Sequence, residues 1–353
     1  GGGLLQDKTS LRSLLYYLSL IYLAKFYGKK VIVFGSGLGP INSRIGKFLT
    51  SKILNKVDLM LLRDENSLLL GRSLGIKRPP TYVTGDLAGL LKGGKTQDIL
   101  KKEGIVKGEG PIIGVSVREP LRNYKALAET LDYLIEKKSA SVVFIPFQGG
   151  DFETIGCVME EMKYPANFVS LNYTPREVIY LISNFDLIIG MRLHSLILSV
   201  TAGTPIFGIS YDHKVETFLQ NLGEPYIPVD VLKGEVLIEE VEKILVASSE
   251  IKEKLEIEKR KLYAKAMLNF GIFFNFLRSV ETIEILGVKV DNLTMDEAIQ
   301  KIDELIKKKS THMVLTLNPE IIVASHRGPE LKDAINCASL RLPDGVGLLI
   351  ASR

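Results

Sequence analysis

Cysteine is scarce in this sequence, and the two that occur lie far apart. Cys157 and Cys337 have no further Cys or His at the spacing of metal ligands. The sequence therefore indicates neither a disulfide framework nor a zinc site, and we expect no bound metal and no cofactor. Two isolated thiols favour the reducing cytoplasm as the place where the protein works.

Long apolar runs are missing too. The longest tracts, residues 14–24 and 268–277, are shorter than the roughly eighteen residues that a membrane-spanning helix needs. The first tract lies between Arg12 and Lys25 and is apolar on most sides. We interpret it as a helix of a protein core, because helices with this pattern are more often buried than laid on lipid.

Neither sign of charge is in large excess. The chain has 45 Lys and Arg residues against 41 Asp and Glu, a formal net charge of +4. No Lys and Arg cluster recurs with interleaved aromatic residues, so nucleic acid is a poor candidate partner, whereas small anionic ligands stay open. The apolar fraction of 46% is ordinary for a globular protein, and 353 residues predict two or three domains.

Short apolar runs rich in β-branched residues alternate with longer helical patterns. This alternation is typical of βαβ units, and runs that are apolar on consecutive residues fit strands of a parallel sheet with helices on both faces. The sequence predicts a doubly wound α/β architecture. The expected strands are 31–34, 59–62, 81–83, 112–117, 141–146, 168–171, 187–189 and 205–209.

The Gly- and Lys-rich stretch 92–110 interrupts this alternation and predicts a linker between two Rossmann-like domains, 1–95 and 96–280. A strand-like segment at 283–290 and a helix start at Thr294, with Glu297 as its capping-box partner, begin a third α/β domain over 281–353. The chain opens on Gly-Gly-Gly, as in the middle of a strand-to-helix turn, and stops in mid-pattern. We therefore expect the first and third domains to be incomplete.

Three expected strands each end beside an arginine: Arg63, Arg118 and Arg192. Ligands of open parallel sheets bind at the carboxyl ends of the strands. Several guanidinium groups that converge on one cleft suit a small anion with more than one charged group. The alternative is a salt bridge to a nearby acid, which is as good an interpretation for Arg63, beside Asp64, whereas binding is favoured for Arg192.

Three further side chains follow expected strands. His194 follows Gly190 at a helix start, where it can act as a general acid or base, although a histidine among apolar residues is often a core residue. Lys214 follows strand 205–209 and could bind phosphate, or be a solvated loop lysine. Asp86 ends another strand, where it lines the cleft or caps a helix. The glycine-rich loop 35–40 lacks the Lys-Ser/Thr ending of a P-loop and implies no nucleotide.

Taken together, five motifs resemble the polysaccharide pyruvyl transferase family, close to its CsaB-type members, over residue 1 to about 276. The usual N-terminal strand and Gly/Asp turn of that family are not in this sequence. The matching motifs are Gly1-Gly2-Gly3-Leu4-Leu5-Gln6-Asp7, Arg63-Asp64, Gly85-Asp86, Gly190-Met191-Arg192-Leu193-His194 and Tyr211-Asp212-His213-Lys214.

The resemblance implies a GT-B-like pair of Rossmann domains that transfers pyruvate from phosphoenolpyruvate, as a ketal, onto a sugar of a lipid-linked cell-wall precursor, with N-acetylmannosamine the implied sugar. His194 would transfer the proton, Arg192 and Lys214 would hold the phosphate, and Arg118 or Arg63 the carboxylate. The further residues that the resemblance makes candidates for substrate binding are Gly1, Gly2, Asp7, Asp64 and Asp86.

Residues from about 283 to 353 resemble a different family, the WecG/TagA/CpsF glycosyltransferases. The motifs are Leu286-Gly287-Val288, Leu315-Thr316-Leu317-Asn318-Pro319-Glu320 and Leu342-Pro343-Asp344-Gly345-Val346-Gly347. The resemblance implies that Thr316 and Asn318 shape an active-site pocket and that Asp344 is the catalytic base, with a UDP-sugar as donor once the domain is complete. The alternative is that these segments are turns only.

Two rival functions stay open for the first family match. One is a conventional GT-B glycosyltransferase with a nucleotide-sugar donor, and the other is a non-catalytic module that binds an anionic glycan; fold alone does not separate them. For the pyruvyltransferase we expect a cytoplasmic protein in peripheral contact with the inner face of the plasma membrane, where a lipid-linked acceptor is found.

Overall fold

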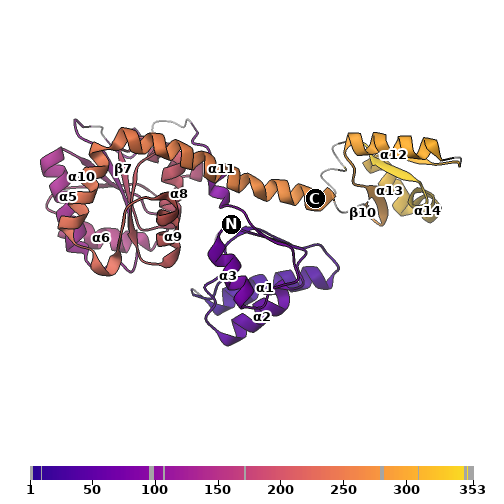
Figure 1. The fold of residues 1–353 in the computed structure, drawn as a ribbon, viewed down its shortest axis with the longest axis horizontal. Coiled ribbons are helices and arrows are strands. Elements are labelled where there is room, and N and C mark those ends of the chain that lie inside the picture. Colours follow the sequence, from indigo (N-terminus) through magenta and orange to yellow (C-terminus); the bar gives the residue numbers. More distant parts are fainter. Residues whose placement is uncertain are drawn as a thin grey trace. The chain divides into compact units, whose positions relative to one another are not determined.

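The computed structural model describes residues 3–8, 10–94, 99–105, 108–170, 172–278, 282–308, 310–345 and 348. The chain divides into two compact units, Gly1–Asn269 and Phe270–Arg353. The first unit contains two lobes, each built on its own parallel sheet (Figure 1). The α/β class that the strand pattern predicts is confirmed.

The N-terminal lobe is a three-stranded parallel sheet in the order β1-β2-β3, with α1, α2 and α3 packed on one face. Ser10, Ser43 and Asp64 cap these three helices by accepting backbone N–H groups of the first turn. The elements are α1 (Leu11–Phe26), β1 (Ile32–Ser36), α2 (Arg44–Leu54), β2 (Leu59–Leu62), α3 (Glu65–Ser73), β3 (Thr81–Val83) and the 3₁₀ helix η1 (Leu87–Leu90).

Helix α1 corrects the interpretation of tract 14–24 as a helix of the core. Only Leu14 and Leu18 are fully buried, on the side that faces the sheet and α2, whereas Leu20, Leu23 and Phe26 are exposed. The helix is apolar on most sides, but it has a packing partner on one side only. Apolar composition indicates what a helix could bury and does not show how much of it is covered.

The C-terminal lobe is a six-stranded parallel sheet in the order β6-β5-β4-β7-β8-β9. Helices α5, α6 and α10 pack on one face, and α7, α8 and α9 on the other, around two hydrophobic clusters. The order reverses at β4, where the chain turns from β5 and β6 on one side to β7 on the other. In such sheets a ligand crevice forms beside this switch point, at the carboxyl ends of the strands.

The elements of this lobe are α4 (Ile99–Lys102), β4 (Ile112–Ser116), α5 (Tyr124–Lys138), β5 (Ser141–Phe144), α6 (Asp151–Glu161), β6 (Asn167–Phe168), α7 (Pro175–Ile182), β7 (Leu187–Gly190), α8 (Leu193–Ala202), β8 (Ile206–Ser210), α9 (His213–Leu222), β9 (Tyr226–Pro228), the 3₁₀ helix η2 (Val229–Val231) and α10 (Gly234–Val246).

Helix α11 (Ser248–Arg278) joins the two lobes of the first unit. Near its start Leu255 packs into the core of the C-terminal lobe. Further along, the buried Asn269 accepts a hydrogen bond from Thr84 Oγ1 at 2.8 Å and donates one to the Gly85 carbonyl at 3.0 Å. The sequence assigned all of 96–280 to the second domain, but this part of α11 packs on the N-terminal lobe.

In the second unit, the strand-like segment 283–290 is a hairpin of two strands rather than one. Leu286 and Gly287 both have positive φ and form its two-residue turn, which matches the twist of the strands. The capping box of Thr294 and Glu297 is confirmed. The elements are β10 (Thr282–Ile285), β11 (Val288–Asp291), α12 (Met295–Lys307), β12 (Val314–Leu317), α13 (Pro319–Arg327), α14 (Pro329–Asn336) and β13 (Leu340–Pro343).

Candidate functional site

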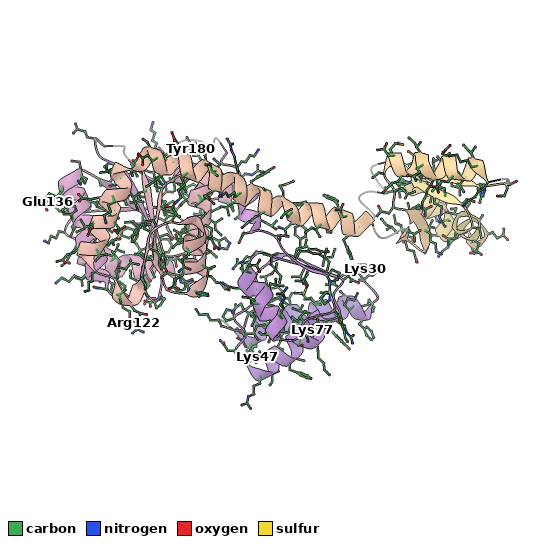
Figure 2. All side chains as sticks on the ribbon, in the orientation of Figure 1. Lys30, Lys47, Lys77, Arg122, Glu136 and Tyr180 are labelled. Carbon is green, nitrogen blue, oxygen red and sulfur yellow. The ribbon has the colours of Figure 1, made fainter. Side chains whose placement is uncertain are left out.

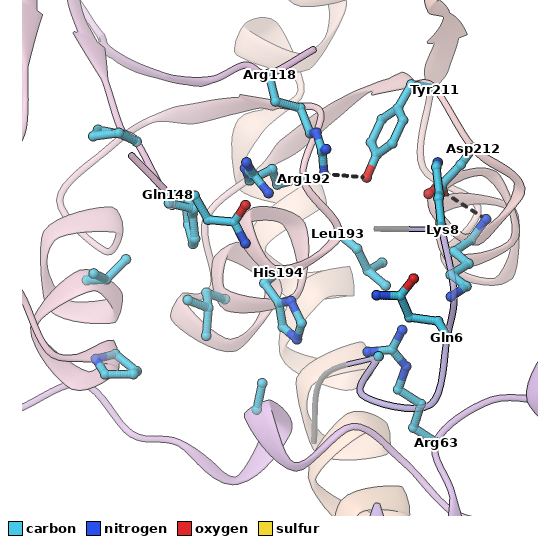
Figure 3. Close-up of a pocket in the computed structure, with 18 of the residues that line it drawn as sticks. Gln6, Lys8, Arg63, Arg118, Gln148, Arg192, Leu193, His194, Tyr211 and Asp212 are labelled. Atoms are coloured by element: carbon cyan, nitrogen blue, oxygen red, sulfur yellow. Dashed lines mark hydrogen bonds between the residues drawn. The ribbon is translucent and has the colours of Figure 1, made fainter. Parts of the chain in front are cut away.

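The carboxyl ends of strands from both lobes of the first unit surround a cavity of about 1040 Å³. The C-terminal lobe contributes the segments that follow β4, β5, β7 and β8, and the N-terminal lobe contributes those that follow β1 and β2. Figure 3 shows the labelled side chains that line it. The cavity wall includes Gln6, Lys8, Arg63, Arg118, Gln148, Arg192, His194, Tyr211 and Lys214.

His194 and Asp86 form a pair between the lobes. Nε2 of His194 lies 3.4 Å from Oδ2 of Asp86. The same carboxylate oxygen accepts from Nη1 of Arg63 at 3.3 Å, and its other oxygen caps η1 through the N–H of Ala88. Burial alone would raise the pKa of Asp86, but the hydrogen bond and charge of His194, the Ala88 N–H and the Arg63 charge hold it below the usual value. Asp86 thus combines both roles that the sequence left open.

Arg63 is held from two sides by acids. Its Nε donates to Asp64 Oδ2 at 3.0 Å and its Nη1 to Asp86, and only 6% of the side chain is exposed. The backbone at Gly37 passes so close that a Cβ there would lie 2.8 Å from Arg63 Nε. Glycine in this loop therefore makes room for the arginine. The salt-bridge interpretation describes most of what Arg63 does here, although the side chain also lines the cavity.

Arg192 is bound to a carboxylate that the sequence analysis missed. Its Nε donates to Asp151 Oδ2 at 2.7 Å, and its Nη2 donates to Asp151 Oδ1. Asp151 is 1% exposed and also accepts the N–H groups of Phe147 and Gln148. The pair fixes the guanidinium by one edge, so Nη1 is left for a ligand in the cavity.

Arg118 differs from both, because no described carboxylate lies within 4.0 Å of its guanidinium. Its Nε donates to the Glu119 carbonyl at 2.8 Å and its Nη1 to the Tyr211 hydroxyl at 3.2 Å, and the group lies over the Tyr211 ring. Burial and the Asp212 charge raise the pKa of Tyr211, so the phenol keeps its proton and can donate it to a ligand. Lys8 Nζ lies 5.7 Å from the same ring.

Lys214 also lines the cavity and, like Arg118, has no acid partner within 4.0 Å among the described residues. Its ammonium donates to the Gly39 carbonyl at 2.8 Å and thus connects α9 to the loop after β1. Burial and the nearby Arg63 charge lower the pKa of Lys214. An anion that bound there would relieve that charge repulsion, which is the situation expected of a phosphate-binding lysine.

Other candidates lie outside this cavity. Both oxygens of Asp7 accept backbone N–H groups, of Asn42 and Ser43, at the start of α2. Asp64 caps α3 and lines a neighbouring cavity of about 620 Å³, together with Arg63, Asp86 and Lys214. Gly1 and Gly2 lie outside the described residues.

Asp151 and Tyr211 were not predicted as site residues, although both follow strands of the C-terminal lobe, like the residues that were predicted. Asp151 is the first residue of α6, directly after the loop that follows β5, so following that strand to the next helix would have found it. Tyr211 directly follows β8 and belongs to a quoted motif, but an aromatic hydroxyl gives no charge signal in sequence. Gln148 lies on the loop just before Asp151, and its side chain points into the cavity in Figure 3.

Among the described residues, no group of three or more His, Cys, Asp and Glu side chains could hold a metal ion. Over the same part of the chain, none of the helices has an apolar stretch that is sufficient to span a lipid bilayer. Cys157 and Cys337 are both free thiols.

In the second unit, the three candidates lie at the ends of neighbouring strands. Strands β12 and β13 pair in parallel, with Thr316 opposite Leu342. The Asp344 N–H donates to the Leu317 carbonyl at 2.6 Å, so Asp344 follows β13 at the edge where Asn318 follows β12. Asn318 caps α13 through the N–H of Ile321, and Thr316 and Asp344 are exposed.

Two lobes with parallel sheets and a ligand cavity at the strand ends define the GT-B class, found in glycosyltransferases and epimerases. HepE from Anabaena, in a structure with UDP and glucose, has a TM-score of 0.55 at 12% identity, covering 75% of each chain. UDP-GlcNAc 2-epimerase from Neisseria meningitidis, bound to UDP-GlcNAc, has a TM-score of 0.52 at 13% identity, covering 78% of this chain and 75% of that one. Such identities show the fold alone.

The chain belongs to the polysaccharide pyruvyl transferase family, whose model matches residues 1–213. Residues 283–353 match the glycosyl transferase WecG/TagA/CpsF family. Both resemblances are confirmed, although the first match ends before residue 276 and one residue before Lys214. The amylovoran biosynthesis protein AmsJ of Erwinia amylovora is 25% identical over 280 residues, which are 71% of this chain and 66% of AmsJ, so the chain spans just under two thirds of that relative's length.

Proposed function

We propose that the first unit transfers pyruvate from phosphoenolpyruvate to a sugar of a lipid-linked polysaccharide precursor and forms a pyruvate ketal. The observation that carries the proposal is that Arg118 and Lys214, two cations without a described acid partner, line one cavity with His194, which is paired with Asp86. Phosphoenolpyruvate carries a carboxylate and a phosphate on a three-carbon frame, so it requires two separate cationic groups.

The arrangement suggests how the donor is held. Arg118 presents its remaining guanidinium N–H groups, beside the Tyr211 hydroxyl, to the carboxylate. Lys214 binds the phosphate as a point charge, and the free edge of Arg192 adds a donor at the start of α8, where the helix dipole favours an anion. Arg63, engaged by Asp64 and Asp86, chiefly positions the Asp86 carboxylate.

His194 supplies the proton that starts the reaction. Protonation of the methylene carbon of phosphoenolpyruvate leaves positive charge on the neighbouring carbon, which one sugar hydroxyl attacks as it loses its proton. The carbon–oxygen bond to phosphate then breaks, inorganic phosphate leaves, and a second hydroxyl of the sugar closes the ketal as it loses its own proton. Asp86 holds the His194 ring and stabilises its protonated form.

The size of the cavity accommodates both substrates. At about 1040 Å³ it is at the upper end of small-molecule sites, which are roughly 300–1,000 Å³, and a three-carbon donor fills only a small part of such a volume. The remaining space suits a pyranose ring of the acceptor. N-acetylmannosamine is the sugar that we propose.

The second unit extends the proposal. A WecG/TagA/CpsF-type domain would attach a sugar to the lipid-linked precursor from a UDP-sugar, with Asp344 as base and Thr316 and Asn318 beside it. The first unit would then pyruvylate such a sugar. One chain would thus carry two consecutive steps of the same pathway.

The test is transfer of labelled pyruvate from phosphoenolpyruvate to an N-acetylmannosamine-containing lipid acceptor. We expect His194→Ala to lower kcat by about 10²–10⁴-fold and Arg118→Ala to raise KM for phosphoenolpyruvate. The control is His326→Ala, an exposed histidine of the second unit, which leaves the rate unchanged. Normal rates with His194→Ala would remove the proton-transfer role and leave the binding role.

A thermal-shift measurement separates the rival donors. At one hundred times its Kd, a bound ligand stabilises the folded state by about 2.7 kcal/mol. We expect phosphoenolpyruvate to raise the unfolding temperature of the first unit, and Arg118→Ala to abolish that rise. A rise with UDP-sugars alone, together with no pyruvyl transfer to a competent acceptor, supports a nucleotide-sugar glycosyltransferase instead. Binding without turnover supports the glycan-binding module.

A further inference from the structure

Large apolar side chains are uncovered on two helices of the N-terminal lobe that pack side by side. On α1, Tyr22 and Phe26 are exposed, the latter by 70%; on α2, Ile45 and Phe48 are exposed, the latter by 58%. Ile45, Phe48 and Lys52 are three and four residues apart, so they share one side of α2. Single exposed apolar residues are ordinary, but four on adjacent helices form a patch that indicates a partner.

Lysines lie directly over these rings. Lys52 Nζ is 4.8 Å from the Phe48 ring centroid, and Lys56 Nζ is 5.4 Å from the Tyr22 centroid, while Tyr22 and Phe26 stack at 6.5 Å. No described carboxylate pairs with Lys52 or Lys56. Both lysines are exposed, so their ammonium groups stay accessible to solvent beside the rings. We call Tyr22, Phe26, Ile45, Phe48, Lys52 and Lys56 the α1–α2 face.

Basic residues predominate in the segment that carries this face, and Asp58, directly after it, pairs with Lys25 and Lys30. Residues 8–57 contain nine Lys and Arg and no Asp or Glu, whereas the rest of the chain carries 36 Lys and Arg against 41 acids. Exposed members close to the face in sequence include Lys29, Lys30, Arg44 and Lys47, and Figure 2 labels Lys30 and Lys47 on this lobe. The nearly neutral total thus conceals a segregated positive charge, together with a compensating negative one elsewhere.

We propose that the α1–α2 face docks on an anionic lipid bilayer. Aromatic rings flanked by lysines suit the boundary between headgroups and acyl chains, where the rings enter the apolar layer and the ammonium groups meet lipid phosphates. Each Lys or Arg near an anionic leaflet contributes about 1 kcal/mol of attraction. The charge complementarity selects this occupant: a second copy of the chain would bring the same positive face against itself.

The inference goes beyond the proposed transfer and explains how the enzyme would reach a lipid-linked acceptor. Only the identity of that acceptor rests on the proposed function. Docking can be measured without any substrate, so a failure of vesicle binding and a failure of pyruvyl transfer are separate results.

The experiment is cosedimentation of the whole chain with vesicles of phosphatidylglycerol mixed with phosphatidylcholine, against vesicles of phosphatidylcholine alone. We expect binding to the anionic vesicles, and a loss of binding as salt rises from about 0.1 to 0.5 M because the Debye length shortens. Lys52→Gln with Lys56→Gln should weaken the partition coefficient by about thirtyfold. Phe26→Ser with Phe48→Ser should weaken it by more than about tenfold.

Control variants change exposed residues of the C-terminal lobe. Lys125→Gln with Lys137→Gln removes two exposed lysines of α5, and Val246→Ser removes a side chain that is 89% exposed. These variants should bind vesicles like the parent. All the substituted positions are exposed, so each variant should keep the unfolding midpoint of the parent.

Three results would overturn the proposal. The first is equal loss of binding in the α5 control, because total charge rather than this face would then bind lipid. The second is equal binding to phosphatidylcholine alone, without salt dependence. The third is dimerisation in equilibrium sedimentation that Phe26→Ser with Phe48→Ser abolishes while vesicle binding stays absent, since the face would then be a contact between copies.

Discussion

Nε2 of His194, at the start of α8, lies 3.4 Å from Oδ2 of Asp86, which follows β3. The histidine belongs to the C-terminal lobe and the carboxylate to the N-terminal lobe. The pair is therefore completed only when the two lobes are correctly joined. Small displacements of a catalytic group can cost two orders of magnitude in rate, so under the proposed function the contacts that hold the lobes together should affect kcat.

The charge of Asp86 should act through His194. Asp86→Asn keeps the size of the side chain but removes the negative charge that stabilises protonated His194, so we expect kcat for pyruvyl transfer to fall by about 10- to 100-fold with little change in KM for phosphoenolpyruvate. Steady-state kinetics check this. A rise in KM at constant kcat would instead make Asp86 a donor-binding residue.

Removal of either partner of the Arg192–Asp151 pair should destabilise the first unit. Asp151 is buried and Arg192 is mostly so, and a single truncation leaves an uncompensated charge, so Arg192→Ala and Asp151→Ala should each lower the free energy of unfolding by about 3–5 kcal/mol. The double variant should lose much less than the sum of the two.

Urea unfolding followed by tyrosine fluorescence measures this change in the first unit alone. The chain has no Trp, and all 13 of its Tyr residues lie between Tyr16 and Tyr263. Additive losses in the double variant would contradict the coupling. Arg118→Ala is the matched comparison, because no described acid pairs with Arg118 and its loss should cost far less stability.

Lys214 should make donor binding depend on pH below the range of an ordinary lysine. Burial and the Arg63 charge lower its pKa, and only the protonated ammonium attracts phosphate. Affinity for phosphoenolpyruvate should therefore be full at low pH and decrease as pH rises through this lowered pKa. Calorimetric titration from about pH 7 to 10 measures the change. Lys214→Arg stays charged over this pH range, so it should remove the pH dependence of binding. If the pH profile of Lys214→Arg is unchanged, another group causes the pH dependence.

Gly85→Ala should displace Asp86. A Cβ at Gly85 would lie 2.8 Å from the Ala266 nitrogen and 2.9 Å from the Lys265 carbonyl carbon, both in the backbone of α11. We expect a loss of about 1–3 kcal/mol in unfolding free energy and a large fall in kcat. Gly156→Ala is the control: nothing lies within 4 Å of its Cβ in α6, so it should stabilise by up to about 1 kcal/mol and leave kcat unchanged.

The spacing of apolar residues along the sequence and the positions where predicted strands end were enough to predict the layers and much of the cavity wall. Residues 59–62 and 81–83 form strands with the predicted bounds, because short β-branched or apolar runs between helices have few other solutions. Arg118, His194 and Lys214 were found because parallel strands bring their carboxyl ends to one edge. Which arginines keep free donors was not predictable, since the Asp151 partner of Arg192 comes from another strand and another loop.

The sequence was least informative about what covers a helix. Leu14 and Phe26 belong to the same apolar helix, but one is fully buried and the other is exposed, because tertiary packing reaches only one side of α1. The contact of Asn269 with Thr84 likewise joins residues 185 positions apart, for which a local pattern gives no signal.

Helix α11 has a practical consequence for anyone who expresses a shorter form of this protein. A gene fragment cut where the family match ends, at residue 213, would omit the helix whose Asn269 satisfies Thr84 and Gly85 and whose backbone covers the glycine before Asp86. The smallest piece that keeps these contacts therefore extends at least to Asn269. An insertion or fusion near Asn269 would therefore also disturb the backbone beside Asp86, even though it lies far from His194 in sequence.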